Sequence, residues 1–207
     1  MVSAADKEQV EMLSKFWNDY GKGILIAVII GLVIGFGWRY WQRHKVQHST
    51  QAAVVFEQYY AASMSKNKRQ AQALLTQLKK KYTDTPYASL ASMFVAKDAV
   101  GDKDNKAALE NLQWVVQHGQ PATFKQIARI RGARVLLAMK QYKQAMQMLD
   151  VVNAKSFAPM IDSTRGQIYL AEGQSAKAKA AFKKAEDAYA ENQIQNPILD
   201  MQVQSLK

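Results

Sequence analysis

Cysteine is absent from this chain of 207 residues, and histidine occurs only at His44, His48 and His118. The protein therefore has no disulfide, no thiolate nucleophile and no sulfur ligand for zinc. His44 and His48 are spaced to share one face of a helix, but zinc sites use three or four ligands. The next carboxylate along the chain, Glu57, lies more than two helical turns beyond His48. We therefore expect neither a metal site nor a bound cofactor.

Sequence motifs of common enzyme classes are also missing. The chain contains no glycine-rich phosphate-binding loop, no nucleophile elbow and no helical zinc-protease motif. With no thiol and few imidazoles, it has little material for nucleophilic or acid–base catalysis. We therefore predict a non-enzymatic protein without catalytic residues.

Charged residues are missing from one long stretch. An uninterrupted apolar run extends from Ile24 to Trp38 and is bracketed by Lys22 and Arg39. With its flanks, residues 21–41, the segment reaches the length of about 20 residues that a helix needs to cross a hydrocarbon core. Aromatic residues lie at both ends of the run, as they do at bilayer interfaces. The run therefore predicts a transmembrane helix over residues 21–41.

The sequence around this helix indicates an anchor that is retained. Residues 1–20 carry carboxylates as well as lysines, unlike the basic start of a signal peptide, and we expect them to form a short N-terminal segment outside the membrane. The bulky, basic stretch after the run offers no small-residue cleavage site. Within the run, Gly31 and Gly35 form a G-x-x-x-G face, which predicts close packing against another membrane helix.

Charge does not decide the orientation of the anchor. The charges up to Trp41 cancel, so the whole formal charge of +11 lies in the rest of the chain. Equal numbers of cations flank the run on its two sides: Lys7, Lys15 and Lys22 before it, and Arg39, Arg43 and Lys45 after it. Long domains can cross a membrane whatever their charge. The absence of cysteine suits an oxidising compartment but is equally allowed in a reducing one.

Residues 42–207 carry the pattern of an all-α domain. Apolar residues recur at three- and four-residue spacing, and strand-like alternation is not evident. The first helix is expected to continue from the membrane to about Met64. Breaks in the pattern fall at Ser65–Lys68, Thr83–Pro86, Gly101–Asn105, His118–Ala122, Met139–Gln141, Asn153–Pro159 and Gly173–Ser175. They leave helices of ordinary length.

Internal repetition predicts the architecture of this domain. Six residues within 163–188 follow tetratricopeptide spacing: Gly166, Tyr169, Gly173, Ala178, Phe182 and Ala185. Small residues allow the paired helices to cross closely, Gly173 permits the turn, and the aromatic rings fill the space between the helices. Weaker residues occupy the same positions 33 residues earlier, around Ala145, and a third, looser unit contains Ala108. We predict a tetratricopeptide-like helical-repeat domain.

Stacked helix pairs present their first helices along one wall, which commonly binds protein segments. Taking Gly166 and Ala133 as equivalent positions places four residues on this wall: Ile130, Arg134, Ser163 and Gln167. Arg134 would donate charge-assisted hydrogen bonds to a carboxylate or carbonyl of a bound segment, and Gln167 would add an amide contact. These residues form the predicted peptide groove.

Basic clusters raise the alternative of nucleic-acid binding. They comprise Lys79, Lys80 and Lys81 and, further on, Arg129, Arg131 and Arg134. The three lysines close a helix, where cations complement the helix dipole and are expected to face water. Tyr142 and Phe182 fall at core positions, so they are not available for stacking on bases. A solvated face attracted to anionic lipid headgroups is therefore the favoured interpretation.

The chain as a whole resembles the YfgM family, the ancillary subunit of the SecYEG translocon in Gram-negative bacteria. The most specific match is the exit from the apolar run, Gly37-Trp38-Arg39-Tyr40-Trp41, followed by a polar helix and tetratricopeptide-like helices to the end. Shorter matches occur at Ala88-Ser89-Leu90-Ala91, Ala133-Arg134-Val135, Leu149-Asp150 and Arg165-Gly166.

The resemblance implies a single-pass protein of the bacterial inner membrane, with a cytoplasmic N-terminus and a periplasmic domain over residues 42–207. It also implies association with the SecYEG translocon and with the periplasmic chaperone PpiD, and a role in assisting newly exported proteins. A tetratricopeptide adaptor for another cell-envelope complex, in division or outer-membrane assembly, is the alternative. An enzyme or nucleic-acid binder is the third possibility and has the least support.

Overall fold

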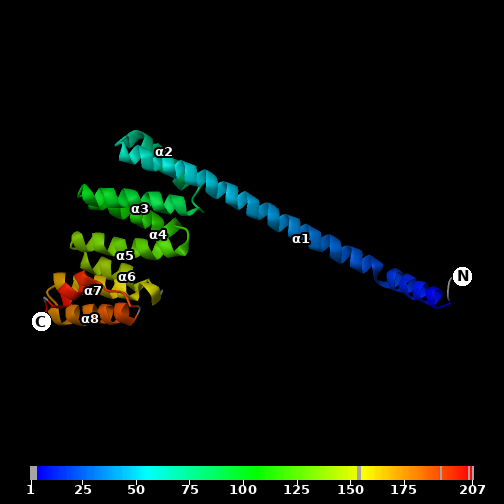
Figure 1. The fold of residues 1–207 in the computed structure, drawn as a ribbon. Helices are drawn as coiled ribbons and strands as arrows, with labels where there is room; N and C mark the ends of the chain where they lie inside the picture. Colours follow the sequence, from blue (N-terminus) through cyan, green and yellow to red (C-terminus); the bar gives the residue numbers. More distant parts are fainter. Residues whose placement is uncertain (1–3, 153–154, 192, 205, 207) are drawn as a thin grey trace. The chain divides into compact units, whose positions relative to one another are not determined.

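The computed structural model describes residues 4–152, 155–191, 193–204 and 206 (Figure 1). Contacts divide the chain into two units, one ending at Thr50 and the other beginning at Gln51, and each is described by itself. The described residues contain no β-strand, which confirms the all-α prediction. The helices are α1 (Ala4–Met64), α2 (Lys68–Lys81), α3 (Pro86–Gly101), α4 (Asn105–His118), α5 (Ala122–Ala138), α6 (Tyr142–Asp150), α7 (Ala158–Ala171), α8 (Ser175–Glu191) and α9 (Pro197–Gln204), with a 3₁₀-helix η1 (Lys155–Phe157) before α7.

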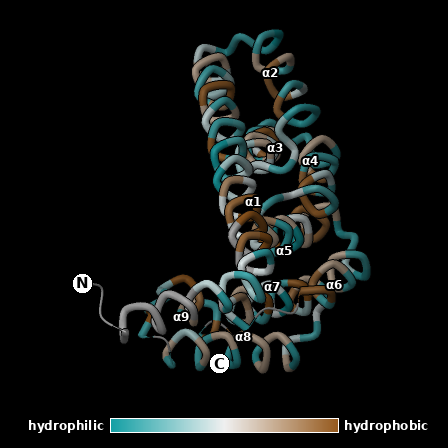
Figure 2. The backbone as a smooth tube through the Cα atoms, turned by 90° about the vertical axis from the view of Figure 1, so that its right-hand side faces the viewer, coloured by the Kyte–Doolittle hydropathy of each residue, from teal (hydrophilic) through white to brown (hydrophobic). Residues whose placement is uncertain are grey.

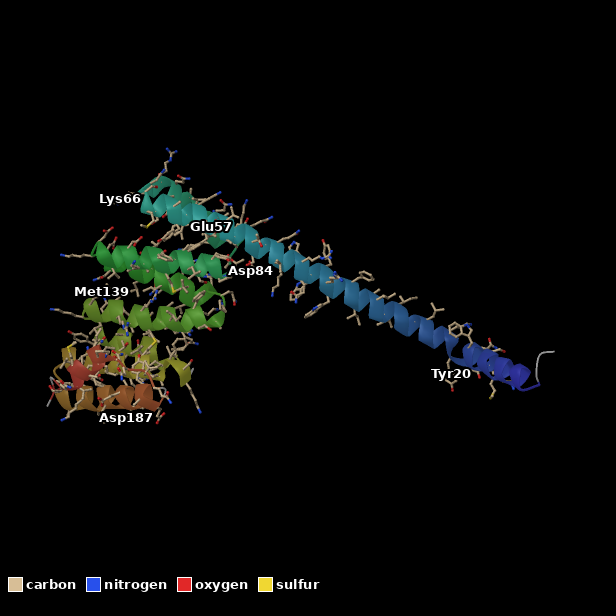
Figure 3. All side chains as sticks on the ribbon, in the orientation of Figure 1. Tyr20, Glu57, Lys66, Asp84, Met139 and Asp187 are labelled. Atoms are coloured by element: carbon tan, nitrogen blue, oxygen red, sulfur yellow. The ribbon has the colours of Figure 1, made fainter. Side chains whose placement is uncertain are left out.

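The first unit is the part of α1 that precedes Gln51. Side chains project from both sides of the helix around Tyr20 (Figure 3). Large apolar side chains that the structure describes there are exposed, with Val33 and Ile34 each 66% exposed. Within the part of the chain that the structure describes, no helix combines the length and the apolar character that crossing a membrane requires. The transmembrane helix over residues 21–41, and the domain limits drawn from it, stay predictions.

The second unit begins within α1, which ends at Met64 as the sequence predicted. In the turn that follows, the side chain of Asn67 accepts a hydrogen bond from the Gln70 amide and so starts α2. Tyr59 on α1 belongs to a buried cluster that also contains Leu78 on α2 and Ala91 on α3. The last turns of α1 are therefore part of the core of the repeat domain.

Four hairpin turns of the second unit share one backbone geometry. A residue with positive φ lies in each turn: Lys66 (58°), Lys103 (61°), Lys140 (59°) and Gly173 (75°). In each turn the next amide donates a hydrogen bond of 2.8 or 2.9 Å to the carbonyl five residues earlier, which is the Schellman ending of a helix. Successive turns are 37, 37 and 33 residues apart. The described residues of the domain therefore form four repeat units, one more than was recognised from the sequence.

The additional repeat unit pairs the end of α1 with α2. Ala71, Leu75 and Leu78 precede Ala108, Leu112 and Val115 by 37 residues, and five of these six side chains are buried. This spacing was visible in the sequence. It was missed because the first helix of the unit is continuous with the predicted membrane anchor.

The remaining repeats are the hairpins α3–α4, α5–α6 and α7–α8, which stack in successive layers (Figure 1). Figure 2 shows hydrophobic and hydrophilic segments alternating along these helices, as expected where one face of each helix is buried. Lys66 and Met139 lie on one side of the stack, where the hairpin turns join paired helices, and Asp84, in an inter-repeat connection, lies on the other side (Figure 3). Helix α3 contacts α5, and α5 contacts α7. The first helices of these repeats therefore adjoin along one wall.

A short terminal helix, α9, closes the last repeat. Leu199 and Val203 are buried in a cluster with Ala178, Phe182 and Ala185 of α8. The terminal repeat of such a stack has no following unit to cover its apolar face, so a capping element is needed. The sequence analysis did not predict this helix, because eight residues are too few for a clear helical period.

Candidate functional site

The residues that define the last repeat meet at the α7–α8 hairpin. Ala178, Phe182 and Ala185 are fully buried, and Tyr169 packs against their cluster. A Cβ atom added to Gly166 would lie 2.5 Å from Cδ1 of Phe182, so the phenyl ring occupies the space that any larger residue would need. Gly173 has a φ of +75°, which glycine adopts without strain.

The predicted peptide groove is only partly on the surface. Ile130 has no exposed surface and belongs to the core between α5, α6 and α7, while Ser163 is only 8% exposed. Both side chains are therefore buried in the helix packing, and their contact with a bound segment stays a prediction. Arg134 is exposed and Gln167 is partly exposed, so these two residues remain candidates on the wall.

Arg134 lies where α5 meets α7. Its Nε donates a hydrogen bond of 3.3 Å to Oγ1 of Thr164, which in turn donates to the carbonyl of Met160. Desolvation lowers the pKa of the Arg134 guanidinium, Arg131 lowers it further by charge repulsion, and Tyr189 acts in the opposite direction. Although the residue as a whole is exposed, this end of the side chain is partly enclosed. The guanidinium therefore gains little compensation from neighbouring groups for its lost hydration.

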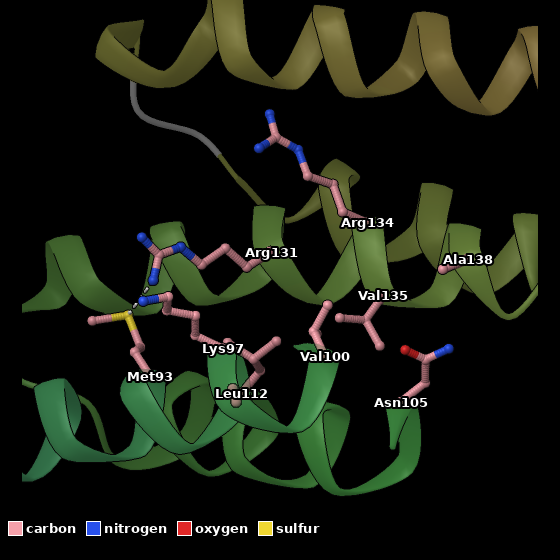
Figure 4. A pocket seen from close by; sticks show the side chains of 10 residues that line it. Met93, Lys97, Val100, Asn105, Leu112, Arg131, Arg134, Val135 and Ala138 are labelled. Carbon is pink, nitrogen blue, oxygen red and sulfur yellow. Dashed lines mark hydrogen bonds between the residues drawn. The ribbon is translucent and has the colours of Figure 1, made fainter. Parts of the chain in front are cut away.

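A cavity of about 300 Å³ opens beside Arg134, between α3, α4 and α5 (Figure 4). We call it the α3–α5 cavity. Six of its lining residues define its chemistry: Met93, Lys97, Leu112, Arg131, Arg134 and Val135. Nη1 of Arg131 lies 3.8 Å from Sδ of Met93, and the Lys97 side chain points towards the same part of the cavity (Figure 4). The cavity thus has apolar walls and three cations.

The sequence analysis missed the contribution of α3 to this site. Lys97 precedes Arg134 by 37 residues, and Arg134 precedes Gln167 by 33. These are the same intervals that separate the hairpin turns, so the three residues hold equivalent positions in successive repeats. The third unit was recognised from its second helix only, and the register was not extended back to Lys97.

The lysine cluster at the end of α2 differs from expectation. Nζ of Lys79 donates a hydrogen bond of 2.9 Å to Oδ1 of Asn111 and lies 4.9 Å from the centre of the Trp114 ring. Burial lowers the pKa of this amine. The prediction that all three lysines face water is therefore wrong for Lys79, which joins α2 to α4, while Lys80 and Lys81 are exposed.

Residues singled out in the first unit have few neighbours. A Cβ atom added to Gly31 or Gly35 would meet no other atom within 4 Å, and helix packing at this face stays a prediction. The rings of His44 and His48 are stacked with their centres 6.5 Å apart. Among the described residues, no group of three or more histidine or carboxylate side chains is arranged to hold a metal ion.

Comparison with known proteins places these features in a family. The profile of the tetratricopeptide repeat-like domain matches residues 14–207. A protein of Haemophilus influenzae named "Ancillary SecYEG translocon subunit" is 27% identical over 99% of this chain and 98% of its own length. Proteins of the same name are 26% identical in Escherichia coli, over 86% of this chain and 85% of the relative, and 23% identical in Neisseria gonorrhoeae, over 98% and 97%.

No solved structure matches the chain. The profile covers the apolar run as well as all four repeat units, and the resemblance to the YfgM family is confirmed by the names of these relatives. The chain therefore belongs to the tetratricopeptide repeat-like domain family and is similar, over nearly its full length, to proteins named as ancillary subunits of the SecYEG translocon.

Proposed function

We propose that this protein is a non-enzymatic ancillary subunit of the Sec translocon in the bacterial inner membrane. The observation that carries the proposal is the near full-length match to proteins of that name, which includes the apolar run and not only the repeats. A generic repeat adaptor would match over its repeats alone. The exposed apolar side chains along α1 support a membrane anchor, because contiguous apolar surface needs a partner or a lipid environment.

In this role the N-terminus is cytoplasmic and residues 42–207 form the periplasmic domain. The repeat wall presents Arg134 and Gln167 to partner segments, and the wall links the translocon to the chaperone PpiD and to newly exported proteins. Exposed polar side chains on adjoining first helices support this assignment.

Crosslinking in intact inner membranes, followed by identification of the bound proteins, tests the proposal. We expect SecY, SecE or SecG to be captured by the full chain and PpiD to be captured with them. An unrelated single-span protein expressed at the same level provides the control. Capture of division or outer-membrane assembly proteins without any translocon subunit would replace the proposal by the alternative adaptor role.

Arg134→Glu tests the contribution of the wall to chaperone capture. We expect this variant to lose PpiD while it retains the translocon. Lys143→Glu is the matched control, since Lys143 is an exposed lysine of α6 away from the wall. Lys183 is less suitable, because its amine pairs with Glu186 at 2.9 Å and with Asp187 at 2.8 Å. Equal capture of PpiD by both variants would remove Arg134 from the binding surface.

A further inference from the structure

The α3–α5 cavity combines unpaired positive charge with apolar walls. Among the described residues, no carboxylate lies within ion-pair distance of Lys97, Arg131 or Arg134. Their polar contacts are instead a thioether for Arg131 and a hydroxyl for Arg134. Arg165 of the same domain, by contrast, contacts Asp150 at 2.9 Å. The cavity is thus a place where the protein leaves cations available for a ligand.

The positions of these cations suit a bound chain rather than a single ion. Lys97 lies on α3, while Arg131 and Arg134 lie on α5, three residues apart and so on the same side of that helix. Arg131 contacts Met93 and Lys97 points towards the same part of the cavity, while the Arg134 guanidinium points towards α7 of the neighbouring repeat (Figure 4). A ligand with negative charge at two separated points would satisfy both groups.

We propose that the α3–α5 cavity binds a segment of a partner protein in which one bulky aliphatic or aromatic side chain lies between acidic residues. The apolar side chain enters the cavity against Met93 and Val135. A carboxylate on one side reaches Arg131 and Lys97, and a carboxylate on the other side reaches Arg134. Arginine is suited to this role because its planar guanidinium binds a carboxylate through two parallel hydrogen bonds.

The size and chemistry of the cavity favour this occupant over others. About 300 Å³ is at the small end of ligand sites, which range from roughly 300 to 1,000 Å³, so the cavity has room for side chains rather than for a pair of acyl chains. Met93 can adapt to different apolar groups, because its side chain is unbranched and polarisable. A second copy of this chain is disfavoured by its formal charge of +11.

This inference rests on the proposed role of the domain as a binding scaffold, but its test needs no translocon. The purified full chain, reconstituted with neutral phosphatidylcholine, is titrated against a fluorescent decapeptide followed by fluorescence anisotropy. The peptide carries an Asp-Phe-Asp core in Gly-Ser flanks and an amidated C-terminus, so only side-chain carboxylates are available. We expect saturable binding that is lost when both Asp residues are replaced by Asn or when Phe is replaced by Ala.

Two variants locate the binding to this cavity. Arg131→Glu should weaken binding by about tenfold or more, because it puts a repelling charge where a pairing one stood. Ala138→Trp should weaken it similarly by filling the cavity, since Ala138 lines the cavity and is exposed at the surface. Lys143→Glu makes the same change of net charge outside the cavity and should bind within about twofold of the wild type. Thermal melts check that all variants remain folded.

Several results would overturn the proposal. One is equal weakening by Arg131→Glu and Lys143→Glu, which would indicate attraction to overall charge. A second is binding of the peptide with Asn in place of Asp that is as tight as binding of the Asp-Phe-Asp peptide. A third is the absence of any binding of the Asp-Phe-Asp peptide to the wild type. The last experiment replaces the peptide by soluble dihexanoyl phosphatidylglycerol. If this lipid raises the melting temperature of the wild type but not of the two cavity variants, and no peptide binds, the cavity is a lipid site and the proposal is wrong. Failure of translocon capture with intact peptide binding would instead count against the proposed function only.

Discussion

Gly166 on α7 faces the side chain of Phe182 on α8. The Phe182 ring lies so near that a methyl group on Gly166 would be 2.5 Å from Cδ1 and 2.6 Å from Cε1. Phe182 is itself fully buried, so the ring cannot swing into solvent. A single hydrogen atom at position 166 is therefore a requirement of the packing, independent of any need for backbone freedom.

Gly166→Ala should lower the free energy of unfolding by about 1–3 kcal/mol, the usual effect of overpacking a core. Gly101→Ala is the matched control, because a Cβ atom there meets no other atom within 4 Å. Alanine also favours helix over glycine, so the control should be neutral or slightly more stable. Urea denaturation followed by circular dichroism measures both, and equal stability of the two variants would contradict the close contact.

Tyr59 links the stability of the first repeat to pH. Burial, with a smaller effect from Asp98, raises the pKa of Tyr59 from 10.0 to about 12. In the unfolded chain the phenol ionises near its ordinary value, so between these pH values the unfolded state binds fewer protons than the folded state. The contribution of this group to stability is therefore complete below pH 10 and declines as the pH rises to about 12.

Tyr59→Phe should remove this part of the alkaline decline. The stability difference between wild type and variant is expected to change by roughly 2 to 3 kcal/mol across the interval, at about 1.4 kcal/mol for each pH unit. Urea denaturation at several pH values from neutral to strongly alkaline measures it. Tyr60→Phe should keep the wild-type decline, since Tyr60 is 45% exposed. A decline in Tyr59→Phe as steep as in the wild type would refute the assignment.

At the scale of the element, α1 carries two different roles along one helix. Its last turns belong to the first repeat, where Val55 and Tyr59 are buried, whereas the apolar side chains of the earlier part are exposed. One continuous helix can do both because helix formation depends on local backbone hydrogen bonds, while burial depends on what packs against each face. The residues of α1 from Gln51 onward therefore belong to the repeat domain, and the anchor role of the earlier residues stays a prediction.

Replacing Gly31 and Gly35 together by Leu tests the earlier part of α1. Leucine keeps the segment apolar but prevents another helix from approaching the backbone closely. We expect translocon subunits to be lost from the co-purified material while membrane insertion is unchanged. The pair Ile30→Leu and Ile34→Leu is the control, as it alters shape without adding volume. If both double variants recover the translocon equally, the repeat domain rather than the helix makes the contact.

The four hairpin turns have the same backbone geometry although their sequences differ. Lysine occupies the left-handed turn position three times and glycine once. The same hydrogen bond to the carbonyl five residues earlier closes all four turns. Glycine adopts that conformation without strain, and in the lysine turns the same hydrogen bond closes the helix. Gln193, between α8 and α9, has the same geometry, so the regular spacing of the four turns, together with their geometry, identifies the repeats.

For the whole molecule, the proposed function depends on which side of the inner membrane residues 42–207 lie. Protease added to spheroplasts should digest residues 42–207 and leave the N-terminal segment protected. An epitope at each end reports the two outcomes separately by immunoblotting. Protection of the C-terminal epitope until the inner membrane is ruptured would place the domain in the cytoplasm. Such a result would exclude contact with periplasmic chaperones, even if the translocon were still captured.

The sequence by itself determined the local features of this protein. The all-α class and the end of α1 at Met64 follow from periodicity and short-range breaks, which act over a few residues. The four hairpin turns also follow from the sequence, since Lys66, Lys103, Lys140 and Gly173 fall within the predicted breaks, whereas the turn at Gln193 was not predicted. The repeat at α7–α8 was visible because its small and aromatic residues stand at their full spacing.

Only the tertiary structure decided which of these residues reach the surface. Ile130 and Arg134 are one helical turn apart, yet the first is buried by neighbouring helices and the second is not. Lys79 is partly buried because its amine donates a hydrogen bond to Asn111 and lies over the ring of Trp114, both on α4. The α3–α5 cavity exists because residues from three helices leave a gap. Burial and cavities depend on contacts between distant parts of the chain, and local periodicity carries no information about them.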